Sequence, residues 1–369
     1  MSAPTGPRRP RQIHQLLAAL SYGDAIGNEA LQIQRHLRAA GHESEIYAES
    51  VHPRMAGHAR PLWRYLDVSG PDTICLFHFS IGSAASRLIY GAPDRLVLIY
   101  HNITPGEWFL GFHSHLAGLC YHGRRELRGF AERAALALGD SDFNRRELEA
   151  AGFDPTGVLP IVLDTRALRG RRSKLVRRLY DDERTNILFV GRVIPNKRIE
   201  DLIRVFALYQ RAIDPTSRLL LVGDTRGHER YYGRLRQLVR DLDARSVVFA
   251  GHVDDEELRA YYSLADVFLC LSEHEGYCVP VVEAMLADVP VVAYAAGAVP
   301  ETLDGGGVLL RDKRPELVAE ILHSVVGDPT LRTAILETQR RAVARVRGRD
   351  FGQLLQGLLE PVLEGRPAS

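Results

Sequence analysis

The sequence predicts an α/β protein with two Rossmann-like domains, each a doubly wound parallel sheet. Short apolar runs typical of buried strands alternate with stretches of helical periodicity, which is the pattern of βαβ units. This alternation stops and restarts around an arginine-rich stretch at residues 164–185. The chain has 369 residues, more than the roughly 250–300 residues at which single cores stop growing. We therefore expect two domains facing across a cleft, with ligands at the carboxyl ends of the strands.

The first domain opens with a strand at residues 12–20 and an amphipathic helix at 28–40. Gly41 follows this helix, in the position where glycine commonly ends one. A short helix at 143–151 precedes Gly152 in the same way. The other strands expected in this domain are residues 45–48, 73–79, 96–100, 135–138 and 158–162.

A second series of βαβ units starts at residue 187. Its strands are expected at residues 187–190, 218–222, 247–250, 267–271 and from Pro290, with helices ending at 212, 242 and 264. After a turn at 305–307 we expect only helix. The last apolar-periodic segment, residues 351–363, follows a complete domain, so we expect it to cross back onto the first domain. The predicted divisions are a disordered tail at 1–11, domains at 12–170 and 171–348, and the returning helix at 349–369.

Composition excludes several classes of protein. Apolar residues make up 46% of the chain and charged residues 25%, as in ordinary soluble globular proteins. The net charge of +1 argues against a dedicated nucleic-acid binder. No apolar run approaches the ~20 residues that a membrane-spanning helix needs. The tail lacks the apolar core of a signal peptide, so we expect a cytoplasmic protein.

The four cysteines show no C-x-x-C spacing. Two of them, Cys75 and Cys270, lie in expected strands. This distribution favours reduced thiols in the core over disulfides or a zinc site.

The most informative stretch is residues 265–294, in which a buried strand, a loop and a helix with Pro280 in its first turn follow one another. Glu275 lies in the loop and Glu283 about one turn into the helix. Carboxylates accept hydrogen bonds from sugar and ribose hydroxyls, and amides at a helix start bind a diphosphate. The alternative is a solvated loop acid and an acid that favours a helix start. The loop amides belong to Gly276, Tyr277 and Cys278.

Other strand ends also carry candidate residues. Arg192 and Lys197 project from one loop and would clamp a diphosphate, although solvated charges are the alternative. Lys197 is one of three lysines in an arginine-rich chain. His101 follows a strand, where it would act as a base or bond a sugar; a structural role remains open, and we assign His78 to the core or the sheet edge. Gly27 lies in a turn that would present amides to a phosphate or simply be a tight turn.

Rival motifs carry little weight. Asp140-Ser141-Asp142 has the D-x-D form that some transferases use to hold a metal, but its place before a helix favours capping. The chain contains no G-x-x-x-x-G-K-[ST], H-E-x-x-H or G-x-S-x-G motif.

Taken together, the Arg192/Lys197 loop, the E-x7-E spacing of Glu275 and Glu283 and the Gly27 turn resemble family 4 glycosyltransferases (glycosyl transferases group 1) of the GT-B fold. The resemblance is strong over residues 186–310 and weaker but continuous over the first domain. Supporting segments are Val248-Phe249-Ala250-Gly251, Glu257-Leu258, Tyr261-Tyr262, Ala265-Asp266-Val267 and Gly297-Ala298-Val299-Pro300-Glu301.

The resemblance implies a retaining transferase that moves a sugar from a UDP- or GDP-sugar to a hydroxyl acceptor, without a metal or other cofactor. In that case the C-terminal domain binds the nucleotide sugar, the N-terminal domain lies on the acceptor side, and the leaving phosphate acts as base. Arg192 and Lys197 would neutralise the leaving diphosphate, Glu275 would contact the donor sugar and Glu283 the ribose. The remaining implied contacts are His101 over the sugar and Gly27 close to the phosphates.

Two departures from the family pattern bear on the donor. Cys278 replaces a glycine that commonly follows the aromatic residue, which narrows the pocket. Ile26 replaces the first of two paired glycines and leaves Gly27 alone to admit phosphate.

Several alternatives stay open at this stage. Aromatic and histidine residues after His101 would line an acceptor pocket or form a helix on the first sheet. Arginines at 124–128 and 166–178 would contact an anionic membrane peripherally or form a solvated basic surface. A UDP-sugar epimerase and a catalytically silent sugar-nucleotide binder are the alternative functions. The base, sugar, acceptor, linkage and oligomeric state are not fixed by the sequence. The aromatic and histidine residues in question are Trp108, Phe109, Phe112, His113, His115 and Tyr121.

Overall fold

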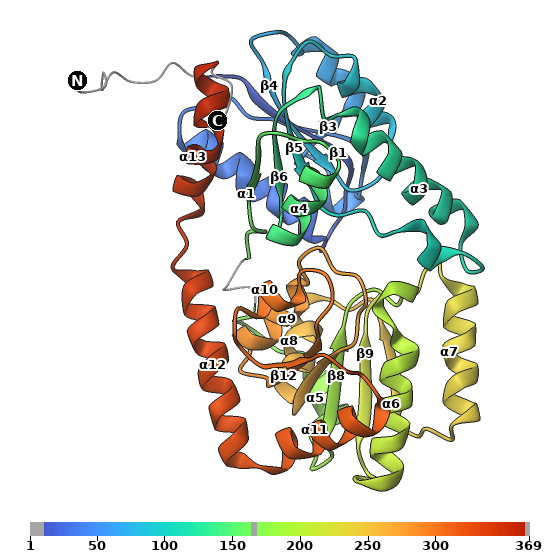
Figure 1. Ribbon diagram of the computed structural model, residues 1–369. Helices are drawn as coiled ribbons and strands as arrows, with labels where there is room; N and C mark the ends of the chain where they lie inside the picture. The colour runs from blue at the N-terminus through green and yellow to red at the C-terminus, as the bar shows by residue number, and fades with distance from the viewer. Residues whose placement is uncertain (1–10, 164–167, 366–369) are drawn as a thin grey trace. The chain divides into compact units, whose positions relative to one another are not determined.

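The computed structural model describes residues 11–163 and 168–365 (Figure 1). The chain divides into two compact units. Unit 1 comprises residues 1–103, 119–162 and 350–369, and unit 2 comprises 104–118 and 163–349. The expected tail at 1–11 lies almost wholly outside the described residues. Among the helices that the structure describes, none has the length and apolar character to cross a membrane.

Unit 1 contains a seven-stranded sheet in the order β3-β2-β1-β4-β5-β6-β7, in which every pair is parallel. The order runs outward from β1 in both directions, which is the doubly wound topology that the sequence predicts. The strands are β1 (Ile13–Leu20), β2 (Ile46–Val51), β3 (Arg60–Pro61), β4 (Ile74–Phe79), β5 (Arg95–Tyr100), β6 (Ala134–Gly139) and β7 (Thr156–Val158).

The core of unit 1 is completed by the end of the chain. Leu355 and Leu359 are buried in one cluster with Ile33 of the first helix and with apolar residues of β4, β5 and β6. Figure 1 shows α13 beside α1. The helices with residues in unit 1 are α1 (Ala25–Ala39), α2 (Ala84–Tyr90), α3 (Ser114–Gly129), α4 (Asp142–Ala150) and α13 (Phe351–Glu364), with 3₁₀ turns η1 (Pro53–Met55) and η2 (Leu62–Asp67).

Unit 2 contains a six-stranded parallel sheet in the order β10-β9-β8-β11-β12-β13. Its strands are β8 (Asn186–Val190), β9 (Arg218–Val222), β10 (Val247–Gly251), β11 (Val267–Cys270), β12 (Val291–Tyr294) and β13 (Val308–Leu310). Its helices are α5 (Lys174–Tyr180), α6 (Ile199–Ala212), α7 (Glu229–Asp241), α8 (Asp255–Leu264), α9 (Val279–Leu286), α10 (Val299–Leu303), α11 (Pro315–Gly327) and α12 (Pro329–Arg347), with 3₁₀ turns η3 (Gly106–Phe109) and η4 (Pro195–Lys197).

The structure differs from the sequence predictions in three places. The segment after Gly307, expected to be only helical, contains β13, whose Val308 pairs with Val292 of β12. The strand expected at 158–162 is β7, which ends at Val158. Residues 104–118 belong to unit 2, because Phe112 packs against the unit 2 core with its ring 5.2 Å from that of Tyr231. Phe112 therefore does not form part of a helix packed on the first sheet.

Candidate functional site

The strongest candidate site in unit 2 is an ion pair between two loops. Lys197 ends the 3₁₀ turn η4 after β8, and Glu275 lies in the loop after β11. The Lys197 Nζ atom is 2.5 Å from the Glu275 Oε2 atom. The Glu275 side chain is 6% exposed and that of Lys197 19%. Strands β8 and β11 are neighbours and parallel, so the loops that follow them meet at one edge of the sheet.

Electrostatics keep Lys197 charged. Burial lowers the pKa of Lys197, but the Glu275 carboxylate and the Cys278 thiol outweigh that effect and raise the pKa above its ordinary value. A paired and hydrogen-bonded ammonium tolerates burial that an isolated one does not. The loop after β11 thus holds a permanent cation at its base.

Backbone contacts fix the position of Glu275. The amide of Ala298 donates to the Glu275 carbonyl at 2.9 Å, and the Asn196 side chain donates to the His274 carbonyl at 3.1 Å. A Cβ atom on Gly297 would lie 2.3 Å from the Glu275 carbonyl oxygen, so only glycine fits there. The hydroxyl of Thr302 donates to the Tyr277 carbonyl. Hydrogen bonds from the η4 turn and from the start of α10 therefore hold the loop after β11 in place.

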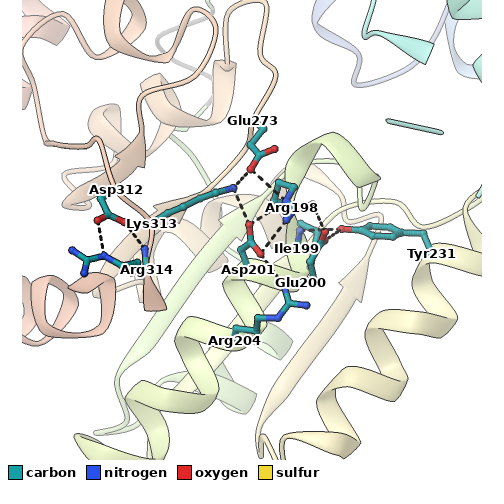
Figure 2. Close-up of polar contacts among 10 residues, drawn as sticks. All are labelled: Arg198, Ile199, Glu200, Asp201, Arg204, Tyr231, Glu273, Asp312, Lys313 and Arg314. Atoms are coloured by element: carbon teal, nitrogen blue, oxygen red, sulfur yellow. Dashed lines mark hydrogen bonds and ion pairs between the residues drawn. The ribbon is translucent and has the colours of Figure 1, made fainter. Parts of the chain in front are cut away.

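A second charge network supports the same loops (Figure 2). Lys313 Nζ lies 2.8 Å from Asp201 Oδ2 and also pairs with Glu273, two residues before Glu275. Arg198 Nε lies 3.1 Å from Asp201 Oδ2 and 3.6 Å from Glu273 Oε1. Burial raises the pKa of Asp201, but hydrogen bonds from Lys313 and Arg198 reverse the shift and lower it. No local sequence pattern distinguishes Lys313 or Glu273 as members of this network.

Glu283 lies on α9 and accepts a hydrogen bond from the Tyr262 hydroxyl at 2.8 Å. Burial raises the pKa of Glu283, although the bond from Tyr262 acts in the opposite direction. Helix α9 starts at Cys278 as N-cap with a proline in its first turn, as the sequence predicts. The contacts described for Glu283 do not join the Lys197–Glu275 pair.

Arg192 lies in the β8–α6 loop and its side chain is exposed. The pKa of His228 is lowered to about 4, chiefly by burial of its ring and next by the positive charge of Arg192. The His228 side chain is buried, and its Nδ1 atom lacks a hydrogen-bond partner among the described residues. His228 is therefore a neutral histidine with an unpaired nitrogen near an arginine. It is a candidate site residue that the sequence did not single out. Its ring lies 5.5 Å from that of His113.

In unit 1, His101 lies directly after β5 inside a buried polar cluster, and its side chain is 1% exposed. Its Nδ1 atom is 3.0 Å from Asp140 Oδ2 and 3.6 Å from Glu29 Oε2. Its Nε2 atom is 2.8 Å from His78 Nδ1. Both ring nitrogens of His101 therefore face protein groups.

Hydrogen-bond donors in this cluster can be assigned in sequence. The amide nitrogen of Gln15 donates to the Ala30 carbonyl at 3.0 Å, which leaves the Gln15 oxygen to accept from His78 Nε2 at 2.9 Å. Burial lowers the pKa of His78, so this ring is neutral and its Nδ1 accepts from His101. His101 then donates from both nitrogens and is an imidazolium.

The pKa values agree with this assignment. Burial lowers the pKa of His101, but Asp140 and Glu29 raise it to about 9. Burial and the neighbouring Asp140 raise the pKa of Glu29 to about 8. At neutral pH a protonated Glu29, an ionised Asp140 and a charged His101 give no net charge, which is the least costly state for a buried group of this kind.

The structure also shows the local contacts of the Asp140-Ser141-Asp142 segment and of the Gly27 turn in unit 1. Ser141 is the N-cap of α4 and accepts a hydrogen bond from the Asn144 amide at 3.1 Å, as the capping interpretation requires. Asp140 instead bonds His101. A Cβ atom on Gly27 would lie 3.0 Å from the Ser21 carbonyl oxygen, so packing of α1 against the preceding turn already demands a small residue.

Two groups of described residues come close enough to hold a metal ion, one around His101 and one around Glu275. A protein cation lies beside the acidic side chain of each group: His101 Nδ1 is 3.6 Å from Glu29 Oε2 in unit 1, and Lys197 pairs with Glu275 in unit 2. Their members are Glu29, His78 and His101, and Cys270, Glu275 and Cys278.

Comparison with known proteins shows which family the segment that contains Lys197 and Glu275 is similar to. Residues 173–342 match the family described as glycosyl transferases group 1. The chain is 31% identical over 250 residues to a D-inositol 3-phosphate glycosyltransferase of Kineococcus radiotolerans, covering 62% of this chain and 57% of that protein. It is 28% identical over 332 residues to a GDP-mannose-dependent alpha-(1-6)-phosphatidylinositol monomannoside mannosyltransferase of Mycolicibacterium smegmatis, covering 80% of this chain and 85% of that protein.

The fold has a solved counterpart. Sucrose-phosphate synthase from Thermosynechococcus elongatus superposes with a TM-score of 0.74 at 18% identity, covering 96% of this chain and 100% of that chain. Residues 173–342 are thus similar to the glycosyl transferases group 1, and the two parallel-sheet units have the GT-B fold. The match to the inositol phosphate enzyme spans little more than half of that relative's length.

Proposed function

We propose that this protein is a retaining, metal-independent glycosyltransferase that moves a sugar from a GDP- or UDP-sugar to a hydroxyl of a glycan, glycolipid or other small acceptor. The observation that carries this proposal is the Lys197–Glu275 pair at the carboxyl ends of β8 and β11, inside the segment that matches the family. The GDP-mannose dependence in the name of the mycolicibacterial relative supports a nucleotide-diphosphate donor.

In this mechanism the diphosphate of the donor binds beside Lys197. Charge develops on the leaving diphosphate in the transition state, and a fixed ammonium stabilises that charge more than it stabilises the bound substrate. Arg192 in the same loop adds a second cation from an exposed position. The amides at the start of α9 add donors for the same phosphates.

Glu275 and Glu283 recognise the rest of the donor. Glu275 accepts hydrogen bonds from hydroxyls of the donor sugar while Lys197 holds its carboxylate in place. Glu283 accepts from the ribose, for which Tyr262 orients it. The departing phosphate takes the proton of the acceptor hydroxyl, so the reaction does not require His101 as a base. We keep contact between His101 and the sugar, and approach of phosphate to Gly27, as predictions.

The test is a binding screen over UDP-, GDP- and ADP-sugars by thermal shift, followed by mass spectrometry of products with and without acceptor alcohols. We expect one nucleotide class to stabilise the protein and transfer to follow. Lys197→Ala and Glu275→Ala should each lower the transfer rate about a hundredfold, as for loss of one oxyanion donor. Lys174→Ala, on the exposed surface of α5, is the matched control and should transfer normally.

Three other outcomes would contradict the proposed function. Interconversion of donors in the absence of acceptor would replace the proposal with an epimerase. Nucleotide binding without turnover of any sugar would indicate a silent binding protein. Absence of any nucleotide-sugar binding, or full transfer by both alanine variants, would refute the proposed site.

A further inference from the structure

Two of the four cysteines are in contact beside the candidate donor site. Cys270 is the last residue of β11, and Cys278 is the N-cap of α9. Their Sγ atoms are 4.0 Å apart, and both residues are buried and free. The other two, Cys75 and Cys120, belong to β4 and α3 in unit 1.

The backbone at Cys278 is costly for this residue type. Cys278 has φ 72° and ψ 60°, the left-handed conformation that glycine adopts without strain. A side chain in this conformation is strained. In this conformation the Cys278 thiol lies against Cys270 instead of pointing into solvent.

The surroundings favour thiol chemistry. The Cys270 sulfur lies 3.3 Å from the Ser272 hydroxyl. Its pKa lies below the ordinary value of a thiol because of the contact with Cys278 and despite burial. The contact with Cys270 and burial raise the pKa of Cys278 well above its ordinary value, although Lys197 acts in the opposite direction, so Cys270 is the thiol that ionises first. The reactivity of a cysteine depends on its thiolate character and on access of the oxidant, so a peroxide must reach this buried pair for the reaction to occur.

We propose that Cys270 and Cys278 form an oxidation site that closes to a disulfide in the presence of a hydroperoxide, and that closure weakens donor binding by the loop at 271–277. The thiol that ionises first attacks one peroxide oxygen and becomes a sulfenic acid; the O–O bond breaks, and the other oxygen leaves as water from hydrogen peroxide or as an alcohol from an organic hydroperoxide. The second thiol then displaces the hydroxyl group of the sulfenic acid as water and forms the S–S bond. Two electrons and two protons pass from the thiols to the peroxide, and an added dithiol reverses the step.

Closure has a geometric consequence for the donor loop. The two sulfurs would approach from 4.0 Å to about 2.05 Å. The loop between them carries Glu275, Gly276 and Tyr277, and hydrogen bonds of 2.5–3 Å length are sensitive to a shift on that scale. We expect closure to disturb the contacts of Glu275 with Lys197 and of Tyr277 with Thr302. In a reducing compartment such a disulfide is transient.

The experiment treats the intact native protein with hydrogen peroxide and counts thiols, with intact-mass measurement and peptide mapping. We expect a loss of two hydrogen atoms, with the disulfide mapped to Cys270 and Cys278 and reversed by dithiothreitol. Cys75→Ala removes a buried strand cysteine of unit 1 and should oxidise like the wild type. Cys270→Ala, with Cys270→Ser as a second variant, should form no intramolecular disulfide.

The second readout is nucleotide binding by the reduced and oxidised forms, and it depends on the proposed function. We expect oxidation to weaken binding at least about tenfold in wild type and Cys75→Ala, and to leave Cys270→Ala unchanged. Four free thiols after treatment, or a disulfide elsewhere, would overturn the oxidation site. Equal binding by both forms would overturn the effect on the donor loop. If neither form binds a nucleotide, the proposed function fails while the mapped disulfide still stands.

Discussion

At the scale of single residues, the candidate site of unit 2 is built around the ion pair of Lys197 and Glu275. Lys197 and Glu275 are mostly buried and lie 2.5 Å apart. Each would be unfavourable without the other, because a buried charge needs a partner of opposite sign. The residues that hold the loop together are thus the same ones that we propose contact the donor.

Removal of one member of this pair should destabilise the protein as well as impair transfer. Lys197→Met leaves the Glu275 carboxylate buried without its partner, and loss of one partner of a buried pair costs about 3–5 kcal/mol. The double variant Lys197→Met/Glu275→Leu removes both charges and should regain most of that loss. Urea unfolding of the four proteins of the cycle measures the coupling. Additive losses in the double variant would show that the pair contributes no interaction energy.

The buried cluster around His101 predicts a pH dependence of stability. Folding raises the pKa of His101 from 6.5 to about 9 and that of Glu29 from 4.5 to about 8. The folded state binds protons more tightly at both groups, so the free energy of unfolding falls as the pH rises. The contribution of Glu29 is lost between pH 4.5 and about pH 8, and that of His101 between pH 6.5 and about pH 9.

The expected result is a thermal midpoint that declines from pH 6.5 to pH 9 in the wild type. Glu29→Gln removes the proton uptake at Glu29, so its decline should be smaller. Differential scanning calorimetry at several pH values compares the two proteins. An equally steep decline in both would contradict the assignment of a proton to Glu29.

At the scale of elements, helix starts position the site. Helix α8 begins with a capping box, in which Asp254 accepts from the Glu257 amide at 2.9 Å and Glu257 accepts from the Asp254 amide at 3.0 Å. The helix then carries Tyr262 to Glu283. A local sequence signal therefore orients a residue that we assign to ribose binding.

Loss of the cap should be measurable on its own. Asp254→Ala removes the acceptor for the Glu257 amide and should cost about 1 kcal/mol in the free energy of unfolding. Asp255→Ala is the matched control: Asp255, in the first turn, acts through its charge on the helix dipole and on Glu283, and its loss should cost a few tenths of a kcal/mol. Urea midpoints give both values. A larger loss for Asp255→Ala would contradict the capping assignment.

At the scale of the whole molecule, the chain leaves unit 1 and returns to it at its end. Helix α13 supplies Leu355, Leu359 and Val362 to the unit 1 core. The unit is therefore incomplete until the last helix has been added. Its stability depends on residues more than 250 positions away from its central strands.

Substitution in α13 should therefore weaken unit 1. Leu355 is 1% exposed, and Leu355→Ala should cost about 2–5 kcal/mol. Gln356→Ala, at the adjacent exposed position, should change stability by less than about 0.5 kcal/mol. Hydrogen exchange should accelerate in β4 and β5 of unit 1 and not in β8 and β9 of unit 2. Equal acceleration in both units would show that they unfold as one.

Much of this architecture could be predicted from the sequence because it is recorded locally. Apolar runs mark β8 and β11, and the helix start at Pro280 and the returning helix at 351–363 follow from short patterns. Lys197, Glu275 and Glu283 were singled out because each follows a strand or opens a helix. Strand β13 was not predicted, because a strand of three residues is too short to show a hydrophobic periodicity.

Partner choice could not be predicted in the same way. Glu273 pairs with Lys313, 40 positions later, and His78 with His101, 23 positions later. Asp140 looked like a cap and is instead a partner of His101, since the end of β6 lies beside the end of β5 in the sheet.

The sequence by itself determined the βαβ order, the helix starts and the residue types at the strand ends, because periodicity and capping act over a few residues. The tertiary structure alone decided that β11 lies beside β8, and so that Glu275 meets Lys197 across 78 positions of chain. The order of strands in a sheet is set by packing over the whole core, and no local pattern contains it.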